Sequence, residues 1–263
     1  MDLTNIADFK FDYDEPFVFT AIHNGHYVSE NINKNLSMEE ETRRREEDSN
    51  TEFFTELCSN SIIAKTSRCE FDINRTPDKA VYMKPEDSWD KKIRKRKPSK
   101  FEITQSILRY DAFYAEAKKH FDILKEKHGK FFVYDIHSYN HRRDGDTKPP
   151  APLPYNPEII IGTNNMPVSR ANIIHDIHKD FLKYDYFGRS LNTRINIKFP
   201  GGNFSRWIHR TYPNNACCVA LEFKKIFMDE WTGEYYPEIM EKLREALMST
   251  IPKIKKNMKK AKF

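Results

Sequence analysis

The chain has 263 residues, 38% of them hydrophobic and 13% aromatic, enough to fill the core of one large α/β domain. Its formal net charge is +5, and so mild an excess does not by itself indicate a nucleic-acid partner. No charged-then-apolar leader opens the chain and no apolar run approaches the roughly eighteen residues of a membrane span, so secretion and membrane insertion have no support. Four cysteines, with Cys217 and Cys218 adjacent in an apolar run, do not suit a disulfide framework. We expect reduced thiols and a cytoplasmic protein.

Two segments hold the excess of positive charge. Residues 91–100 contain seven basic residues and no acid, and residues 252–263 contain six lysines and no acid. We expect a basic insertion at about 84–100 and a basic C-terminal tail at about 252–263 within one domain spanning 1–263, both of them solvated. The alternative is that they bind nucleic acid or an acidic partner, with Trp89 and Phe101 available for stacking.

The predicted elements alternate along the chain between strands and helices. In the first half they are a strand at 17–22, a loop with some helix at 29–47, a helix at 52–60 opened by Asp48 or Ser49, and two extended runs at 61–66 and 70–73. In the second half they are a helix at 101–127 closed by Gly129, strands at 130–137 and 157–163, a helix near 168–184, strands at 194–199 and 217–223, and a final helix from about 237.

This alternation predicts an α/β fold, a single domain with a mostly parallel mixed central sheet flanked by helices. In such sheets the ligand lies beyond the carboxyl ends of the strands. Four predicted strand ends carry polar residues, namely His23, the pair Asn74 and Arg75, His137, and Glu222.

Two of these strand ends present metal-binding side chains. A catalytic zinc ion takes three protein ligands from His, Asp and Glu and keeps a fourth position for water. His23 and His137 each follow a predicted buried strand, and Asp135 lies two positions before His137, on the same side of the strand, where it can orient the imidazole or a substrate. A single histidine is more often structural, but two at strand ends, with an arginine and a glutamate at two others, favour a metal site.

The remaining strand ends carry a candidate binding residue for a carboxylate, Arg75, and a candidate general base, Glu222. Arg75 presents a fork of donors that a carboxylate accepts bidentately. Glu222 lies in the almost wholly apolar run 217–223, so its carboxylate needs either a buried partner or a reactive pocket. A carboxylate beside a metal site is suited to take a proton from water and pass it to a leaving amine.

In order and content, several segments resemble the N-formylglutamate amidohydrolase family, which is related to the zinc carboxypeptidases and aspartoacylase. The similarity covers residues 17 to 245, and its segments are AIHNGHY, EEDSNTEFF, EFDINRTP, DIHSYN, PEIIIGT, IKFPGGNFSRWIHRTYP and ALEFKKIFMDEWTG. The most specific matches are Asp-Ile-Asn-Arg and Leu-Glu-Phe-x-x-x-Phe-Met-Asp-Glu. The resemblance implies a phosphorylase/hydrolase-like fold related to the zinc carboxypeptidases.

By the same resemblance each site residue has a role. His23 and His137 are implied as zinc ligands, Asn74 with Arg75 as the grip on the substrate carboxylate, and Glu222 as the general base. The family usually has Pro-His-Ser-Gly at the first site, whereas this chain has Ile-His-Asn-Gly at 22–25.

The third metal ligand is open between three residues. Carboxypeptidase relatives place a glutamate three residues after the first histidine, and His26 stands there in this chain. We favour Asp48, which matches an acid that opens the next helix in the family, over Glu47 and His26. Arg206 and His209 follow a glycine turn and match a basic patch near the family's pocket, so they either contact substrate or lie on the surface of a hairpin.

The sequence therefore predicts a Zn²⁺-dependent amidohydrolase that cleaves the amide of a small N-acyl (formyl) amino acid or of a similar carboxylate-bearing substrate. Formylglutamate is the substrate that the family implies, and a peptide terminus or a modified amino acid is the alternative substrate. The substrate is expected to be a small molecule, with no membrane partner and with nucleic acid disfavoured. A non-catalytic scaffold that binds nucleic acid or an acidic partner through its lysine-rich segments is the alternative.

Overall fold

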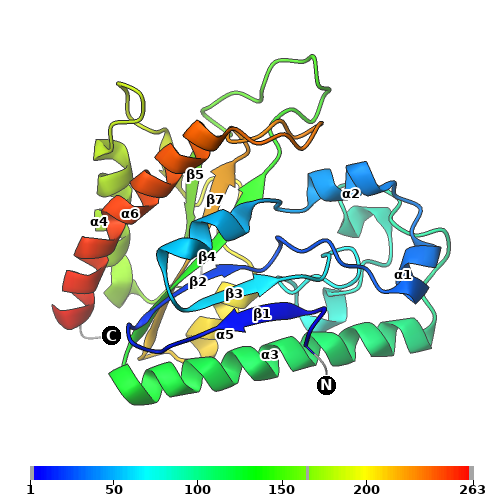
Figure 1. Ribbon diagram of the computed structural model, residues 1–263, viewed down its shortest axis with the longest axis horizontal. Coiled ribbons are helices and arrows are strands. Elements are labelled where there is room, and N and C mark those ends of the chain that lie inside the picture. The colour runs from blue at the N-terminus through cyan, green and yellow to red at the C-terminus, as the bar shows by residue number, and fades with distance from the viewer. Residues whose placement is uncertain (1–2, 164–165, 261–263) are drawn as a thin grey trace.

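A computed structural model describes residues 3–163 and 166–260, and a seven-stranded mixed sheet forms its centre (Figure 1). The strands are β1 (Ala7–Lys10), β2 (Phe17–Ala21), β3 (Ser61–Ala64), β4 (Phe131–Tyr139), β5 (Ile159–Gly162), β6 (Thr193–Ile195) and β7 (Ala216–Lys224). The α-helices are α1 (Glu30–Asn35), α2 (Glu40–Glu46), α3 (Lys100–His128), α4 (Ala171–Lys183), α5 (Asn203–Thr211) and α6 (Pro237–Lys260). Four short 3₁₀ helices are η1 (Thr51–Leu57), η2 (Pro77–Lys79), η3 (Pro85–Asp87) and η4 (Val168–Arg170).

The strand order is β1-β3-β2-β4-β7-β5-β6, with a parallel centre. Strands β3, β2, β4 and β7 run parallel, whereas β1 pairs antiparallel with β3 and β5 pairs antiparallel with β7. In the β4–β7 pair, His137 lies opposite Glu222. The predicted α/β fold class, with its mixed and mostly parallel sheet, is confirmed.

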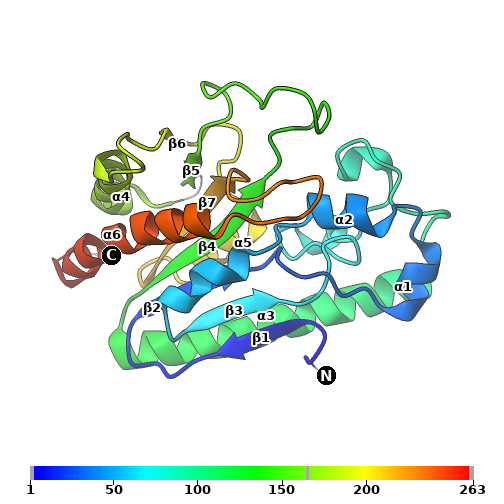
Figure 2. The ribbon, with the colours of Figure 1, turned by 45° about the horizontal axis from the view of Figure 1, so that its top comes forward.

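Helices cover both faces of the sheet because side chains alternate along each strand. Phe19 and Tyr134 face a cluster that α4 and α6 complete, and Val18 and Val133 face a cluster built with α3 and α5. Figure 2 shows α3 running along one side of the sheet and α6 along the other. Within the part of the chain that the structure describes, no helix is both long and apolar enough to span a membrane.

Three predicted elements are wrong in detail. Residues 70–73 are not a strand, because the backbone turns there. The N–H of Asp72 donates to Ala80 O and not to a neighbouring strand. The side chains of Glu70 and Asp72 form buried ion pairs. The helix expected from Asp48 is the 3₁₀ helix η1, which begins at Thr51 with Asn50 as its N-cap. The stretch that holds Arg206 and His209 is helix α5, not a hairpin.

The basic segments are not simply solvated. Residues 93–96 pair with residues 35–37 through backbone hydrogen bonds, among them Ser37 N–H to Ile93 O at 2.8 Å and Lys95 N–H to Asn35 O at 2.8 Å. The expected C-terminal tail belongs to α6 as far as residue 260, with Ile254 and Met258 buried, and its last part, 261–263, lies outside the described residues.

The glycine in the His-Asn-Gly-His stretch allows two backbone segments to meet. Tyr27 N–H donates to Lys65 O at 2.7 Å, and a Cβ on Gly25 would lie 2.3 Å from the Lys65 carbonyl carbon and 2.4 Å from Thr66 O. Any side chain at this position would therefore push the loop after β2 away from β3.

We predict that Gly25→Ala lowers the free energy of unfolding by about 3 kcal/mol, at the upper end of overpacking costs. Urea denaturation at pH 7 measures the change. Gly233→Ala is the control, because Gly233 has φ +79° but open space around it, and strain alone should cost only about 1 kcal/mol there. Equal losses in the two variants would show that the close approach at Gly25 does not constrain the fold.

Candidate metal centre and active site

A cavity of about 510 Å³ opens at the carboxyl ends of β2, β4 and β7. Its walls are strongly polar. The charged and imidazole side chains in them are His23, Glu46, Asp48, Arg68, Asp72, Arg75, Lys79, His137, Arg143, Arg206, Glu222 and Lys225. Seven predicted site residues, Asn74 among them, therefore face one space. His23, His137 and Glu222 lie at the ends of strands that meet at one edge of the sheet, whereas the others come from loops and from α5.

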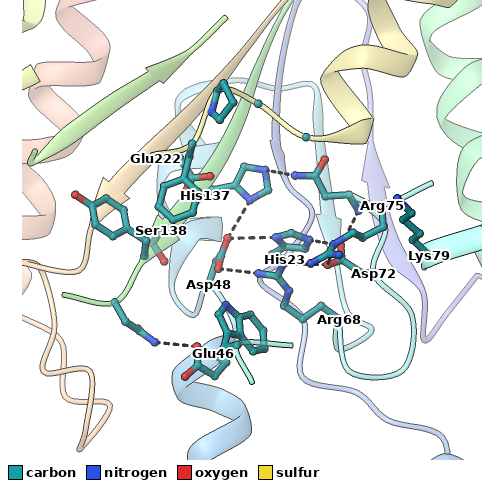
Figure 3. A pocket seen from close by; sticks show the side chains of 18 of the residues that line it. His23, Glu46, Asp48, Arg68, Asp72, Arg75, Lys79, His137, Ser138 and Glu222 are labelled. Carbon is teal, nitrogen blue, oxygen red and sulfur yellow. Dashed lines mark hydrogen bonds and ion pairs between the residues drawn. The ribbon is translucent and has the colours of Figure 1, made fainter. Parts of the chain in front are cut away.

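Two imidazoles and one carboxylate converge at the base of this cavity. His137 Nδ1 lies 2.9 Å from Asp48 Oδ2, and His23 Nδ1 lies 3.5 Å from the same oxygen. One ligand atom from each of the three residues lies within 4.8 Å of those of the other two, and all three side chains are buried. Figure 3 shows both rings turned toward Asp48.

A second carboxylate holds the far side of each ring. His23 Nε2 lies 2.7 Å from Asp72 Oδ1, and His137 Nε2 lies 3.2 Å from Asp135 Oδ2. These contacts direct both Nδ1 atoms toward Asp48 and select the tautomer, as carboxylates behind metal-binding histidines do. Asp135 thus orients an imidazole and is not among the described residues that line the cavity.

Asp72 and Asp135 are themselves held rigidly. Asp72 accepts hydrogen bonds from Arg68 Nη2 at 2.9 Å and from the Tyr82 hydroxyl, and Asp135 accepts one from Thr20 Oγ1 at 2.9 Å. Both carboxylates are fully buried. Their positions, and hence the directions of the two imidazoles, are fixed by the fold.

The third carboxylate, Asp48, is placed by the backbone of the first ligand. Asp48 N–H donates to His23 O at 3.0 Å, which ties the turn after α2 to the end of β2. Burial opposes its ionisation, but hydrogen bonds from His137 and His23 outweigh burial and hold the pKa of the Asp48 carboxyl below its usual range. Asp48 is therefore an anion that faces two ring nitrogens.

His26 and Glu47, the other candidates for a third ligand, are engaged elsewhere. His26 Nδ1 lies 2.5 Å from Glu47 Oε2, and Glu47 also accepts hydrogen bonds from Arg43 and Ser67. Neither residue is among the described residues that line the cavity.

Glu222 faces the cavity from β7, beside His137 (Figure 3). In the described part of the chain its carboxylate has no hydrogen-bond partner. Burial raises the pKa of Glu222 to about 7, and the nearby His137 only partly opposes this. A carboxylate with such a pKa is suited to exchange protons near neutral pH.

Asn74 and Arg75 reach the cavity from a loop rather than from a strand. Asn74 Oδ1 accepts from Phe204 N–H at 2.9 Å, and its Nδ2 lies 3.3 Å from His137 Nε2. This packing depends on Gly202, where a Cβ would lie 2.2 Å from Asn74 Oδ1. The Arg75 side chain is 40% exposed, lies 3.8 Å from Asp72 and donates from Nη2 to Asp87 O at 3.2 Å.

The two residues of the predicted basic patch separate. Arg206 lines the cavity from α5. His209, one turn later, faces the sheet, where its Nε2 accepts from Cys218 N–H at 3.0 Å, and its side chain is buried. His209 is not among the described residues of the cavity wall.

Sequence reasoning missed Arg68, Asp72 and Tyr82, which connect the charges behind His23. Asp72 lies inside the Asp-Ile-Asn-Arg motif, so the motif carried a signal, but its assignment to a strand hid the role of the acid. Sequence reasoning also missed Arg143 and Glu46 on the opposite wall of the cavity, where Arg143 donates two hydrogen bonds to Glu46, at 3.1 and 3.0 Å.

The three convergent residues fit a zinc ion in chemistry and in spacing. Ligands at about 2.0–2.1 Å from zinc in a tetrahedron lie roughly 3.3 Å apart. The two histidine-to-Asp48 distances, 2.9 and 3.5 Å, are close to this value, and the three ligand atoms all lie within 4.8 Å of one another. Three buried carboxylates, those of Asp48, Asp72 and Asp135, surround the two imidazoles, and negative charge gathered in this way favours a cation between them. Despite burial, Asp135 and Asp48 raise the pKa of His137 above its usual range, so the site favours positive charge.

The fold and the site thus define an α/β protein whose cavity surrounds a His-Asp-His cluster suited to a divalent metal. The family model described as N-formylglutamate amidohydrolase matches residues 15–228. The chain belongs to this family, as the sequence motifs predicted. Membership of the family supports the assignment of the chain as an amidohydrolase.

Solved structures agree on the fold. An N-formylglutamate amidohydrolase from Ralstonia eutropha is 15% identical, with a TM-score of 0.77 over 96% of this chain and 98% of that one. A gene product of Agrobacterium tumefaciens is 16% identical, with a TM-score of 0.65 over 95% of this chain and 96% of that one. None of the curated proteins matches the sequence.

The buried His209 predicts acid sensitivity of the fold. Burial lowers the pKa of His209 to about 4, whereas in the unfolded chain it is near 6.5. Between these values the unfolded chain binds more protons, so this residue's contribution is intact above pH 6.5 and declines as the pH falls to 4, by at most about 3 kcal/mol.

In His209→Gln an amide oxygen can still accept from Cys218 N–H but cannot titrate. We expect its free energy of unfolding to fall less than that of the unsubstituted protein between pH 6.5 and 4, measured by urea denaturation at several pH values. Parallel declines in the two proteins would contradict the burial of a neutral imidazole.

Proposed function

We propose that this chain is a zinc-dependent amidohydrolase that cleaves the amide of a small N-acyl amino acid carrying a free carboxylate. The observation that carries the proposal is the convergence of His23, His137 and Asp48 in a cavity that also holds Glu222 and Arg75. Formylglutamate is the substrate that the family suggests. The four free cysteines support a cytoplasmic location, and we propose that residues 1–263 act as one catalytic domain.

The cluster would hold the zinc ion through the Nδ1 atoms of His23 and His137 and through Asp48 Oδ2. A bound zinc ion supplies Lewis-acid polarisation of the scissile carbonyl and lowers the pKa of water. Asp72 and Asp135 keep the two rings in place, so that ligand geometry does not depend on the substrate.

Arg75 and Asn74 would bind the substrate carboxylate. Arg75 is partly exposed at the cavity and uses one donor on Asp87 O, so other guanidinium donors are open to a carboxylate. Asn74 is fixed by its hydrogen bond from Phe204 N–H. Arg206 on α5 adds positive charge to the same wall.

Glu222 would manage the proton. Its carboxylate would accept one proton from the attacking water while the water oxygen bonds to the carbonyl carbon. The C–N bond then breaks and the same proton passes to the departing nitrogen, so that a carboxylic acid and an amine are released. Its position beside His137 and its raised pKa support this role.

Zinc binding is the first test. We expect about one zinc ion per chain in the purified, zinc-reconstituted protein, and loss of most of it in His137→Ala, because two remaining ligands hold zinc poorly. Elemental analysis after dialysis measures the ratio. His26→Ala is the matched control, because His26 is not among the described residues that line the cavity. This variant should keep its zinc. Equal zinc in all three proteins would place the metal elsewhere.

Substrate recognition is the second test, with a panel of N-formyl and N-acetyl amino acids. For the best substrate, Arg75→Gln should lower kcat/KM roughly 10- to 100-fold, mainly through KM, since a charged hydrogen bond contributes about 1.5–3 kcal/mol. The same compound with its carboxylate converted to a carboxamide should be a poor substrate of the unsubstituted enzyme and should lose no further activity in Arg75→Gln. A similar loss with both compounds would remove Arg75 from carboxylate recognition.

A further inference from the structure

A second cavity, of about 300 Å³, lies in the basic segment and shares no described lining residue with the first. Of the described residues that line it, none is acidic and six are basic: Lys84, Lys92, Arg94, Lys95, Arg96 and Lys97. Like charges gathered around one hollow repel one another, which favours an anion between them. Nothing in the proposed hydrolysis uses this cavity.

Arg94 is the fixed charge of this cavity. It is 7% exposed, and its guanidinium donates only to backbone carbonyls: Tyr82 O at 3.3 Å, Cys69 O at 3.0 Å and Glu70 O at 3.3 Å. In the described part of the chain its Nη1 has no hydrogen-bond partner and no carboxylate pairs with it. Burial lowers the pKa of Arg94, because carbonyl dipoles replace water without neutralising the charge.

The surrounding backbone is held in place rather than left to solvent. Leu36 and Arg94 form an antiparallel bridge, and Asn35 bonds to Arg96 in both directions, from Arg96 N–H at 3.1 Å and to Arg96 O at 3.2 Å. Ile93 is buried in a cluster with Tyr82. The basic side chains therefore project from a fixed backbone, which reduces the entropy lost when they gather on a ligand.

The nearby acids leave most of this charge unbalanced. Glu102 pairs with Arg96 through two hydrogen bonds, at 2.8 and 3.0 Å. Asp87 accepts from the backbone N–H groups of Met83 and Lys84. Lys92 and Lys97 are exposed at the cavity and have no carboxylate within ion-pair distance among the described residues.

The size and surroundings of the cavity favour a small ligand over a nucleic-acid strand. About 300 Å³ is at the lower limit of small-molecule pockets. Of the two aromatic residues considered for stacking on bases, Trp89 is already packed, since its ring lies 6.2 Å from the Tyr82 ring with the Arg68 guanidinium 5.0 Å above it. Phe101 is 65% exposed but is not among the described residues that line the cavity. Single-stranded nucleic acids need open aromatic platforms along a groove.

We propose that this cavity is an anion site for a small molecule carrying two or more phosphate charges, bound by Arg94 together with Lys92 and Lys97. Phosphates suit it because lysines bind them as point charges and several negative charges fit into a small volume. The site is separate from the proposed hydrolytic centre and does not depend on it.

Inorganic pyrophosphate is the probe, titrated by calorimetry into the full-length protein prepared without metal, because pyrophosphate also binds zinc ions. Sodium chloride keeps the ionic strength constant. We expect binding at one site per chain, roughly tenfold weaker in the double variant Lys92→Gln/Lys97→Gln, because two charge contacts are removed. Both lysines are exposed, so this variant should fold. Arg94→Gln is not used, because Arg94 is buried and its loss could unfold the segment.

The charge-matched control is Lys256→Gln/Lys259→Gln, which removes two exposed lysines from the other basic segment and should change affinity less than twofold. Arg75→Gln should likewise have no effect, because Arg75 lines the first cavity. The proposal is overturned by absence of binding, by equal weakening in both lysine variants, or by weakening in Arg75→Gln. Tighter binding of a single-stranded oligonucleotide than of pyrophosphate, reduced in both lysine variants, would also overturn it in favour of a nucleic-acid surface.

Discussion

The pairing of each imidazole with a buried carboxylate is the interaction on which the site depends. Asp72 and Asp135 hold the Nε2 edges of His23 and His137, so the Nδ1 edges must face Asp48. Burying three carboxylates near one another is costly unless positive charge accompanies them. Arg68 supplies one such charge, Arg75 lies 3.8 Å from Asp72, and a divalent cation held by His23, Asp48 and His137 would supply more.

The sheet turns this cluster into a site for chemistry. Parallel strands β2, β4 and β7 end at one edge, and the register that places His137 opposite Glu222 brings a carboxylate to the cluster. Among the residues that the structure describes, this carboxylate has no hydrogen-bond partner. Close contacts hold nearby loops in place: Gly25 lies against the backbone of Lys65 and Thr66, just after β3, and Gly202 lies against the Asn74 side chain. Gly202 lines the cavity, so its close contact helps to set the position of Asn74 in the cavity wall.

How much the sequence predicts follows from how local each signal is. The strands ending near His23, His137 and Glu222 are apolar runs, and their direction in a mostly parallel sheet follows from the helices between them, so the fold class and the grouping of these residues could be predicted. Asn74 and Arg75 reach the cavity too, but from a loop whose path is set by contacts of Asp72 with Arg68 and Tyr82 that no short motif encodes.

The basic segment and His209 also show that a local sequence pattern does not predict contacts between distant parts of the chain. A run of lysines and arginines is typical of solvated loops, and the burial of Arg94 results from backbone pairing with residues about sixty positions earlier. His209 lies one turn from Arg206 on α5, and only the packing of that helix on the sheet determines that one side chain reaches the cavity while the other meets Cys218.

The coordination shell of the metal tests the central claim most directly. X-ray absorption at the zinc edge of the reconstituted protein should show only nitrogen and oxygen neighbours at about 2.0–2.2 Å, with scattering from two imidazole rings. A sulfur neighbour at about 2.3 Å, or scattering from three rings or from fewer than two, would contradict a centre built from His23, Asp48 and His137.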